Sequence, residues 1–254
     1  MDPVKVRNLK IGEGIPKICV PLVGVSKDEI LEAAKEIKEI PMDFVEWRAD
    51  WFCDILEWEK ALEVLKGLRA ILGDTPLLFT FRTEREGGKR ALDVQPYTSL
   101  NQAASESGYV DMVDVELFAG EEAVCKVIAQ AHRFGVAVIV SNHEFGQTPA
   151  KDEMIRRLCK MQSLGADLVK IAVMPDCPGD VLTLMAAVEE MHRKHADRPV
   201  IAMSMAGLGM ASRLCGELFG SAVTFGAAGK ASAPGQIDAR ELAKALSLLH
   251  SGLG

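Results

Sequence analysis

Residues 168–173 are Leu168-Val169-Lys170-Ile171-Ala172-Val173, an apolar run with one lysine inside it. The run is continuously hydrophobic rather than alternating, which is typical of a parallel strand covered on both faces. Seven further runs of this kind are spread along the chain, at residues 17–22, 44–48, 77–82, 112–117, 137–142, 200–205 and 223–226. We therefore expect eight buried parallel strands.

Longer amphipathic stretches separate these runs and predict helices. The first follows Ser26, which forms a capping-box pattern with Glu29. The others cover residues 57–72, 97–107, 121–134, 151–164, 179–195, 212–219 and 238–249. Eight strand–helix units of about 30 residues predict an α/β fold, a closed (β/α)8 TIM barrel. An open, doubly wound sheet is the alternative, but equal units without an interrupting domain favour closure.

Two short segments precede the first predicted strand. Val4-Lys5-Val6 and Leu9-Lys10-Ile11 flank Arg7-Asn8. This arrangement predicts an N-terminal β-hairpin that closes the bottom of the barrel. Because no linker or low-complexity segment interrupts the pattern, we expect residues 1–254 to form a single barrel domain.

The composition limits the classes of function. The chain has 29 Lys and Arg against 36 Asp and Glu, a net charge of −7 and no basic block, so nucleic acid is not expected as a partner. No uncharged run reaches about 18 residues, so we expect no membrane span. The residues after Met1 lack the apolar core of a signal peptide, which predicts a cytoplasmic protein. Six scattered cysteines agree with this; we expect most of them in the core and Cys177 exposed.

The barrel predicts where functional residues lie, because active sites of such barrels form at the carboxyl ends of the strands. Arg48, Arg82 and Arg213 all come at or just after predicted strand ends. Guanidinium groups match carboxylates in two-point geometry, so the three arginines predict an anionic substrate. The alternative is pairing of each arginine with a nearby carboxylate, among them Glu46, Asp50 and Glu86.

Lys170 is the most informative charged residue, because it lies inside an apolar strand. An ammonium group facing a barrel interior loses hydration, and the three arginines oppose its charge, so both effects favour the neutral amine. A neutral amine attacks a ketone and forms an imine, which eases removal of an adjacent proton. The alternative is a buried ion pair of Lys170 with Glu46, Asp114 or Glu116.

His143 ends the strand that precedes the strand of Lys170, which places the two residues side by side in barrel order. Histidine moves protons in both directions near neutral pH, as imine chemistry requires. A hydrogen-bonded core histidine is the alternative. Glu46 and Asp114 are the candidates to orient the ring. No His-x-His pattern occurs, so we expect no metal site.

With these residues assembled, the chain resembles the type I 3-dehydroquinase family, whose members form a Schiff base. The resemblance runs over nearly the whole chain and rests on motifs in a fixed order: Glu46-Trp47-Arg48, Leu78-Phe79-Thr80-Phe81-Arg82, Glu86-Gly87-Gly88, Asp114-Val115-Glu116-Leu117, Ser141-Asn142-His143, Lys170-Ile171-Ala172-Val173-Met174-Pro175, Met203-Ser204-Met205, Ser212-Arg213 and Ser232-Ala233-Pro234-Gly235-Gln236. It implies dehydration of 3-dehydroquinate to 3-dehydroshikimate in the shikimate pathway, a homodimer, and no metal or organic cofactor.

The resemblance also implies roles for individual residues. Lys170 would form the Schiff base with the C3 ketone of the substrate. His143 would take the C2 proton and protonate the departing C1 hydroxyl, and Glu86 would support this acid–base chemistry. Arg213 would bind the substrate carboxylate. The residues expected to hold the ring hydroxyls or to close the site are Glu46, Arg48, Arg82, Ser232 and Gln236, and the supporting residues are Asp114, Glu116, Met203, Met205 and Phe225.

The chain departs from the family pattern at three positions. Pro21 stands where some members have a serine that contacts the substrate, Glu144 where aspartate is common, and Gly229 where some relatives have a lysine. These departures concern contacts at the rim of the site rather than the expected chemistry.

Two other functions are compatible with the residues alone. A class I aldolase acting on a phosphorylated ketose would use the same interior lysine, with the glycine-containing loops at 207–209 and 226–229 around the phosphate. A non-enzymatic anion-binding protein would have every charged residue at the strand ends paired. Retro-aldol assays and the reactivity of Lys170 distinguish these alternatives.

Overall fold

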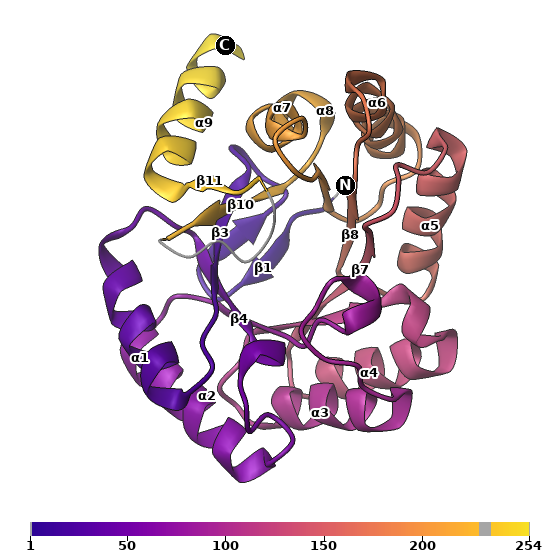
Figure 1. The fold of residues 1–254 in the computed structure, drawn as a ribbon. Coiled ribbons are helices and arrows are strands. Elements are labelled where there is room, and N and C mark those ends of the chain that lie inside the picture. Colours follow the sequence, from indigo (N-terminus) through magenta and orange to yellow (C-terminus); the bar gives the residue numbers. More distant parts are fainter. Residues whose placement is uncertain (1, 229–234, 254) are drawn as a thin grey trace.

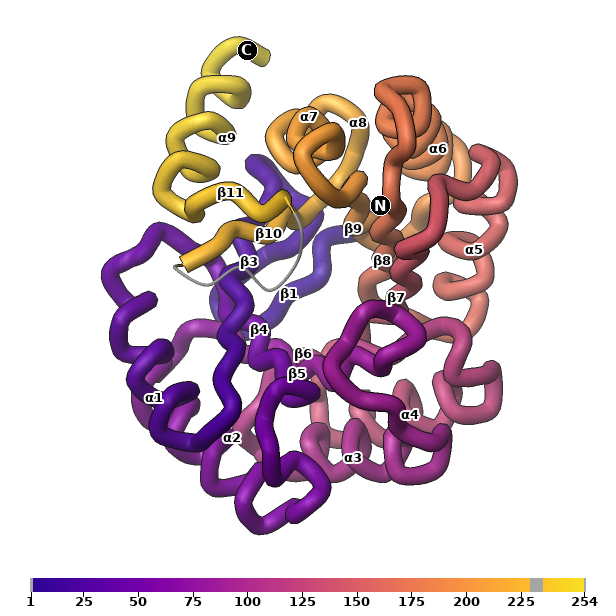
Figure 2. Tube along the Cα trace, in the orientation of Figure 1, coloured from indigo at the N-terminus to yellow at the C-terminus, as the bar shows by residue number. Residues whose placement is uncertain are grey.

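Eight parallel strands surround a central axis in the computed structural model, which describes residues 2–228 and 235–253 (Figure 1). Their bounds are β3 (Lys17–Leu22), β4 (Phe44–Arg48), β5 (Leu77–Thr80), β6 (Met112–Glu116), β7 (Ala137–Glu144), β8 (Leu168–Val173), β9 (Val200–Ser204) and β10 (Val223–Ala227). Each strand from β10 through β3 to β9 pairs with the next, and the short β11 (Ile237–Asp238) extends the sheet beside β10. The trace in Figure 2 follows the same ring. The predicted α/β barrel is confirmed.

The helices lie outside the ring of strands (Figure 1). Their bounds are α1 (Lys27–Glu36), α2 (Trp58–Leu72), α3 (Val94–Glu106), α4 (Glu121–Arg133), α5 (Lys151–Ser163), α6 (Pro178–Lys194), α7 (Met210–Leu214), α8 (Gly216–Phe219) and α9 (Ala239–Leu253), with 3-10 turns η1 (Ile37–Glu39), η2 (Ala49–Trp51), η3 (Glu84–Glu86) and η4 (Leu117–Ala119). In the part of the chain that the structure describes, no helix is both long and apolar enough to cross a membrane.

One predicted helix, at residues 212–219, is wrong as a single element. The chain leaves the helical conformation at Cys215, so that α7 and α8 are separate. The hydroxyl of Thr224 donates to the carbonyl of Arg213 at 3.0 Å. In a continuous helix that carbonyl would accept the N–H of Glu217, so a contact from β10 replaces the helical hydrogen bond.

The ring closes between β9 and β10. Val200 and Ser221 form a parallel bridge, and the N–H of Ala222 donates to the carbonyl of Val200 at 2.7 Å. The hydroxyl of Ser221 accepts the N–H of Ala202 at 3.0 Å, where a strand neighbour would otherwise accept it. Closure excludes the alternative of an open, doubly wound sheet.

The inward-facing side chains change character along each strand. Because side chains alternate with a period of two, β8 presents Leu168 and then Lys170 to the interior, and β4 presents Phe44 and then Glu46. At the amino ends of the strands the interior is an apolar cluster, and the hairpin β1 (Val4–Val6) and β2 (Leu9–Ile11) adds Val6 and Ile11 to it. The strand residues of this cluster at that end are Cys19, Phe44, Leu78, Met112, Ile139, Leu168, Ile201 and Val223. The hairpin therefore closes the bottom of the barrel, as predicted.

The predicted start of α1 is confirmed in part. The Ser26 hydroxyl accepts the N–H of Glu29 at 3.3 Å, which caps the helix. The Glu29 carboxylate, however, accepts the N–H of Val25 at 2.9 Å rather than that of Ser26. The reciprocal half of the capping box is therefore shifted by one residue.

The expectation that most cysteines lie in the core is wrong. Cys19 is buried inside the barrel, whereas Cys53 and Cys125 are exposed. The expectation that Cys177 is exposed is confirmed. Cys125 belongs to α4, where the buried positions fall on either side of it in the sequence. A hydrophobic neighbourhood in the sequence does not show which face of an amphipathic helix a small residue occupies.

Candidate active site

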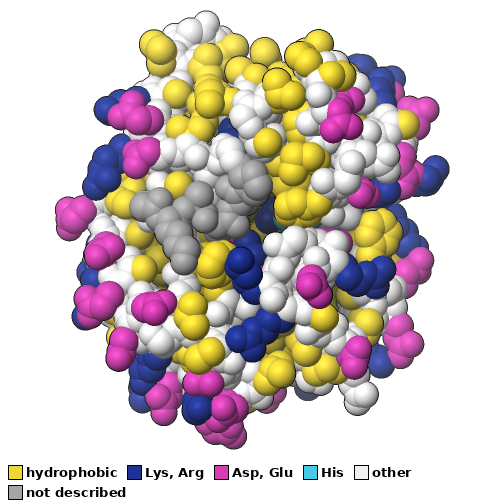
Figure 3. Space-filling model, in the orientation of Figure 1, with side chains coloured by type: hydrophobic (Ala, Val, Ile, Leu, Met, Phe, Trp, Pro, Cys, Tyr) yellow, Lys and Arg dark blue, Asp and Glu magenta, His cyan; other side chains and the backbone are white. Residues whose placement is uncertain are grey.

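A cavity lies at the carboxyl ends of the strands, where the barrel predicts an active site. Lys and Arg side chains lie near the middle of the face drawn in Figure 3. The predicted residues that line the cavity are Glu46, Arg48, Arg82, Glu86, His143, Lys170, Met203, Met205, Arg213, Phe225 and Gln236. Ser232 lies outside the described residues. Among the residues that the structure describes, no group of His, Cys, Asp and Glu side chains could hold a metal ion.

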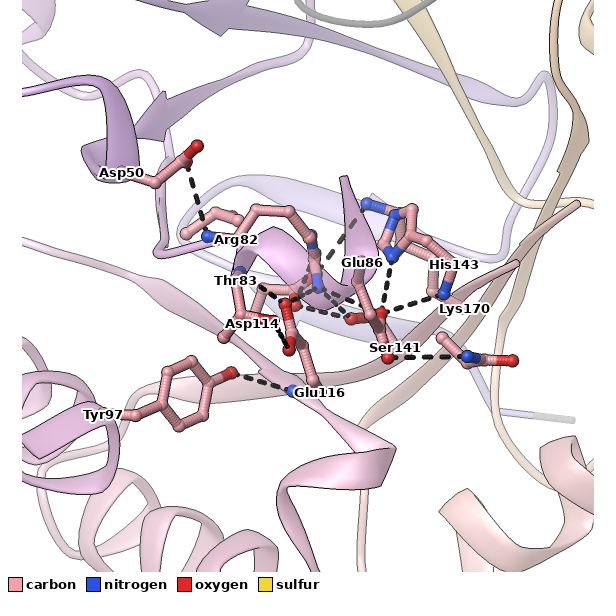
Figure 4. A network of polar contacts seen from close by, with 12 residues as sticks. Asp50, Arg82, Thr83, Glu86, Tyr97, Asp114, Glu116, Ser141, His143 and Lys170 are labelled. Atoms are coloured by element: carbon pink, nitrogen blue, oxygen red, sulfur yellow. Dashed lines mark hydrogen bonds and ion pairs between the residues drawn. The ribbon is translucent and has the colours of Figure 1, made fainter. Parts of the chain in front are cut away.

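The Lys170 side chain points into the barrel from the middle of β8, and only 5% of it is exposed. Its Nζ lies 3.7 Å from Asp114 Oδ2, which is longer than a hydrogen bond, and 4.4 Å from the centre of the Phe225 ring. The carboxylate and the aromatic face partly offset the lost hydration of the ammonium group. Of the three carboxylates proposed as ion-pair partners of Lys170, Asp114 is the one within 4 Å, and its contact is long. The amine also lies near the His143 ring (Figure 4).

His143 lies on β7, which continues through Glu144 and is two residues longer than predicted. Its ring Nδ1 is 3.0 Å from Glu86 Oε2, and its backbone N–H donates to the same oxygen at 2.9 Å. The expectation that Glu46 or Asp114 orients the ring is wrong. The 3-10 turn η3 after β5 ends at Glu86 and brings this carboxylate against β7.

The Glu86 carboxylate and the His143 ring are in hydrogen-bonding contact, so the charge of one affects the protonation of the other. Burial raises the pKa of Glu86 to about 8, although Arg82 opposes the rise; Glu116 adds to it. Burial, with Arg82 and Lys170, lowers the pKa of His143 well below its ordinary value. When Glu86 is ionised and His143 is neutral, Nδ1–H donates to the carboxylate and Nε2 keeps a free lone pair. An imidazole in this state is a general base.

A network of ion pairs is centred on Arg82 (Figure 4). Its Nη2 donates to Asp114 Oδ1 at 2.7 Å, and its Nη1 donates to Glu116 Oε1 and to the Ser141 hydroxyl, both at 3.0 Å. Burial alone would lower the pKa of Arg82, but Asp114 and Glu116 hold it well above its ordinary value. Burial would raise the pKa of Asp114, but Arg82 and Lys170 hold it low. Both terminal nitrogens of Arg82 are thus occupied, although the residue lines the cavity.

Sequence reasoning missed residues that complete this network. Thr83 donates to Glu116 through its backbone N–H at 2.8 Å and its hydroxyl at 2.6 Å. The hydroxyl of Tyr97 accepts the N–H of Glu116 at 2.9 Å. Thr83 and Ser141 could have been found by their position at strand ends. Tyr97 lies on α3, and no spacing in the sequence links it to β6.

The two other predicted arginines differ in their surroundings. Arg48 binds Asp50 through two parallel hydrogen bonds of 2.8 and 2.9 Å, so the pairing alternative applies to this residue. Arg213 is buried, its Nη1 lies 3.7 Å from Met203 Sδ, and burial lowers its pKa to about 10. A desolvated guanidinium strongly favours an anionic ligand, so the surroundings of Arg213 suit a carboxylate in the cavity.

The model of the type I 3-dehydroquinase family matches residues 18–252. The chain belongs to this family. The 3-dehydroquinate dehydratase of Clostridioides difficile (strain 630) is 52% identical over 250 residues and 98% of each chain is covered. That of Salmonella agona (strain SL483) is 51% identical, with 98% of this chain and 99% of the relative covered. Among solved structures, the type I 3-dehydroquinate dehydratase from Clostridium difficile with covalently modified comenic acid has a TM-score of 0.97 and 52% identity, covering 99% of this chain and all of that one.

The two glycines of the Glu86-Gly87-Gly88 motif have a steric role. Gly87 adopts a φ of +83°, and a Cβ there would lie 2.2 Å from the Phe145 ring. A Cβ on Gly88 would lie 1.8 Å from the carbonyl oxygen of Arg82. Neither position tolerates a side chain without movement. The two glycines therefore allow the turn that carries Glu86 to His143.

Proposed function

We propose that this chain catalyses the dehydration of 3-dehydroquinate to 3-dehydroshikimate in the shikimate pathway, through a Schiff base on Lys170 and with His143 as the general acid and base. The observation that carries the proposal is that a buried lysine amine and a Glu86-bound histidine line one cavity in a member of the type I 3-dehydroquinase family. The similar Clostridium difficile structure holds covalently modified comenic acid.

The reaction begins at Lys170. The neutral amine attacks the C3 ketone to form a carbinolamine. A proton from solvent converts the hydroxyl of this adduct into water, and its departure leaves a protonated imine. Asp114, 3.7 Å from Nζ, stabilises the positive charge of this imine. The imine withdraws electrons from the neighbouring C2 and so makes its proton acidic. Hydrolysis of the protonated product imine by one water restores the neutral amine and returns one proton to solvent, and the net products are 3-dehydroshikimate and water.

His143 carries out both proton transfers. With Nδ1–H on the Glu86 carboxylate, Nε2 removes the C2 proton and the electron pair passes into the enamine. The cationic ring then gives this proton to the C1 hydroxyl, which leaves as water while the enamine reverts to an imine. The shared Oε2 of Glu86 holds the ring in one orientation through both transfers.

Charged side chains on one part of the cavity wall and apolar side chains on another bind the substrate. Arg213 binds the substrate carboxylate. Arg82 holds Asp114 and Glu116 in place and contacts the substrate from the same wall. The remaining hydroxyl contacts come from Glu46, Arg48 and Gln236, and the apolar faces come from Met203, Met205 and Phe225.

Borohydride reduction tests the proposal. Incubation with 3-dehydroquinate and sodium borohydride, followed by digestion and mass spectrometry, is expected to place a reduced adduct on the peptide that contains Lys170. Lys89, whose ammonium stacks on Trp51, serves as the control; its replacement by Ala should leave trapping intact. An unmodified Lys170 would overturn the mechanism. Cleavage of ketose phosphates without turnover of 3-dehydroquinate would favour a class I aldolase instead.

The proposal extends to assembly and location. A homodimer is implied by the family resemblance, and exposed apolar side chains on α8 and α9 offer a surface for it. These side chains are Leu218, Leu248, Leu249 and Leu253. The free state of all six cysteines fits a cytoplasmic location. Sedimentation of Leu218→Glu against Leu182→Glu, an exposed leucine of α6, tests the dimer surface.

A further inference from the structure

Asn142 connects the catalytic pair to an arginine on the outer layer of the barrel. Its Nδ2 lies 3.4 Å from Glu86 Oε1 and donates to it, while its Oδ1 accepts from Arg157 Nη1 at 2.8 Å. Arg157 belongs to α5, and its Nε donates to Glu153 at 2.7 Å. Both oxygens of Glu86 therefore face β7, with Oε2 on His143 and Oε1 on Asn142.

The chemistry of arginine fixes the orientation of the Asn142 amide. A guanidinium group has only donors, so the amide oxygen must face Arg157 and the NH2 group must face Glu86. Turned by 180°, the amide would place NH2 against the guanidinium and its carbonyl against Glu86. A carbonyl oxygen at that position favours a protonated carboxyl group, whereas NH2 favours the ionised one.

We propose that Arg157 is a positioning residue, which acts through the Asn142 amide to favour the ionised state of Glu86, the state that makes His143 a base. The inference rests on the proposed function, because it concerns the same acid–base pair. Arg157 is not among the residues that line the cavity. Its influence passes through one hydrogen bond to Asn142 and one from Asn142 to Glu86.

Several other charged groups also face Glu86 and His143. The effect of the Asn142 amide on the protonation of Glu86 is therefore modest. Burial and the carboxylates Asp114 and Glu116 favour the protonated form of Glu86, and Arg82 favours the ionised form. Lys170 and Arg48 oppose a positive charge on His143. Glu144 also contacts Arg157, at 3.3 Å. Arg85 of η3 is a further charged side chain near the pair.

The test replaces Arg157 by Met, which keeps the length of the side chain and removes the donors. The acidic limb of the kcat profile, where activity rises with pH, is expected to move up by about half a pH unit, a roughly threefold lower kcat on that limb. KM and borohydride trapping on Lys170 should stay unchanged. Arg156→Met is the matched control: Arg156 also pairs with Glu153 but is 76% exposed and makes no contact with Asn142.

A double-mutant cycle separates positioning from a general loss of structure. If Arg157 acts through Asn142, Asn142→Ala alone should move the limb by a similar amount, and Arg157→Met should add little in the Asn142→Ala background. Arg157→Lys, which keeps a donor, should restore part of the profile. An unmoved limb in a folded Arg157→Met protein, or additive effects in the cycle, would overturn the inference, as would a change confined to KM.

A second readout does not depend on turnover. Imidazole nitrogen chemical shifts of His143, followed by NMR against pH in the free protein, report the same titration. If the native protein does not turn over 3-dehydroquinate, the proposed function fails while this measurement still tests the inference. If the Arg157→Met variant is too unstable for kinetics, Asn142→Ala with the NMR titration decides the question, and an unchanged His143 titration there contradicts it.

Discussion

The two ends of the barrel interior are built from the same strands and the same inward-facing side but differ in chemistry. At the amino end, β4, β6 and β8 contribute Phe44, Met112 and Leu168 to a closed apolar cluster. Two residues further along β6 and β8, the interior holds Asp114 and Lys170, both almost completely buried. The barrel interior therefore changes from apolar to charged between one inward-facing residue of a strand and the next.

The comparison shows that the stability of the charged end depends on ion pairing. The stability of the apolar end depends on how well its side chains fill the space. Charges this deeply buried are stable only when each has partners, and Arg82 supplies them for Asp114 and Glu116. The apolar end needs only side chains that fill the space. Substitutions at the two ends should therefore change different quantities, and this can be tested.

The largest effect is expected from Lys170→Ala compared with Leu168→Ala on the same face of β8. Loss of the amine should lower turnover by at least about 10⁴-fold. Loss of the Leu168 side chain should lower the free energy of unfolding by about 2–5 kcal/mol and leave kcat per folded molecule nearly unchanged. Steady-state kinetics and urea unfolding of both variants check this. A comparable loss of kcat in both would show that the two ends are not separate.

Within the charged end, His143→Ala should slow turnover by about 10²–10³-fold, because proton transfer loses its catalyst. The imine should still form, since Lys170 and Asp114 are untouched. Kinetics combined with borohydride trapping measure both properties. His132→Ala, a surface histidine bound to Asp167, is the control and should retain full activity. Loss of trapping in the His143 variant would mean that the ring is also required for imine formation.

Arg82→Met tests whether the charged end is stable only as a network. Two buried carboxylates would lose their cation, and the free energy of unfolding should fall by about 3–5 kcal/mol. Chemical denaturation near neutral pH measures this. The exposed Arg193, paired with Glu189 on α6, is the control, and its replacement by Met should change stability little. A small effect of Arg82→Met would show that water or nearby cations replace it.

The smallest effect is expected in the pH dependence of the free energy of unfolding. The pKa of Glu86 is raised in the folded protein to about 8, so the folded state binds more protons than the unfolded state between the ordinary pKa and this value. Its contribution to stability is therefore present at low pH and is lost as the pH rises through about 8. His143, with a lowered pKa, has the opposite sign and gains stability as the pH rises through its ordinary value.

Glu86→Gln removes the first of these contributions. Between about pH 5 and pH 9 the native protein should lose of the order of 1 kcal/mol or more relative to this variant. Unfolding by urea at a series of pH values measures the difference. Parallel curves for the two proteins would mean that Glu86 titrates normally.

The strands were predictable because continuous apolar runs mark buried parallel strands, and Lys170 stood out because a charge inside such a run is costly. The partner of His143 was not predictable from spacing, since Glu86 reaches it through a turn allowed by Gly87 and Gly88. The Arg82 network was also missed, because it joins the segment that follows β5 to β6 and β7 across the interior. The family resemblance named Glu86, but only the fold shows why it lies there.

The closure of the ring has a consequence for how the barrel moves. In the described part of the chain, β9 meets β10 through the Val200–Ser221 bridge and the Ser221 hydroxyl, whereas β6 and β7 pair over five residues. Strands held by fewer backbone hydrogen bonds open at lower free energy. The cylinder therefore has a seam, and the amides of Ala202 and Ala222 should exchange with deuterium sooner than those in the middle of β6.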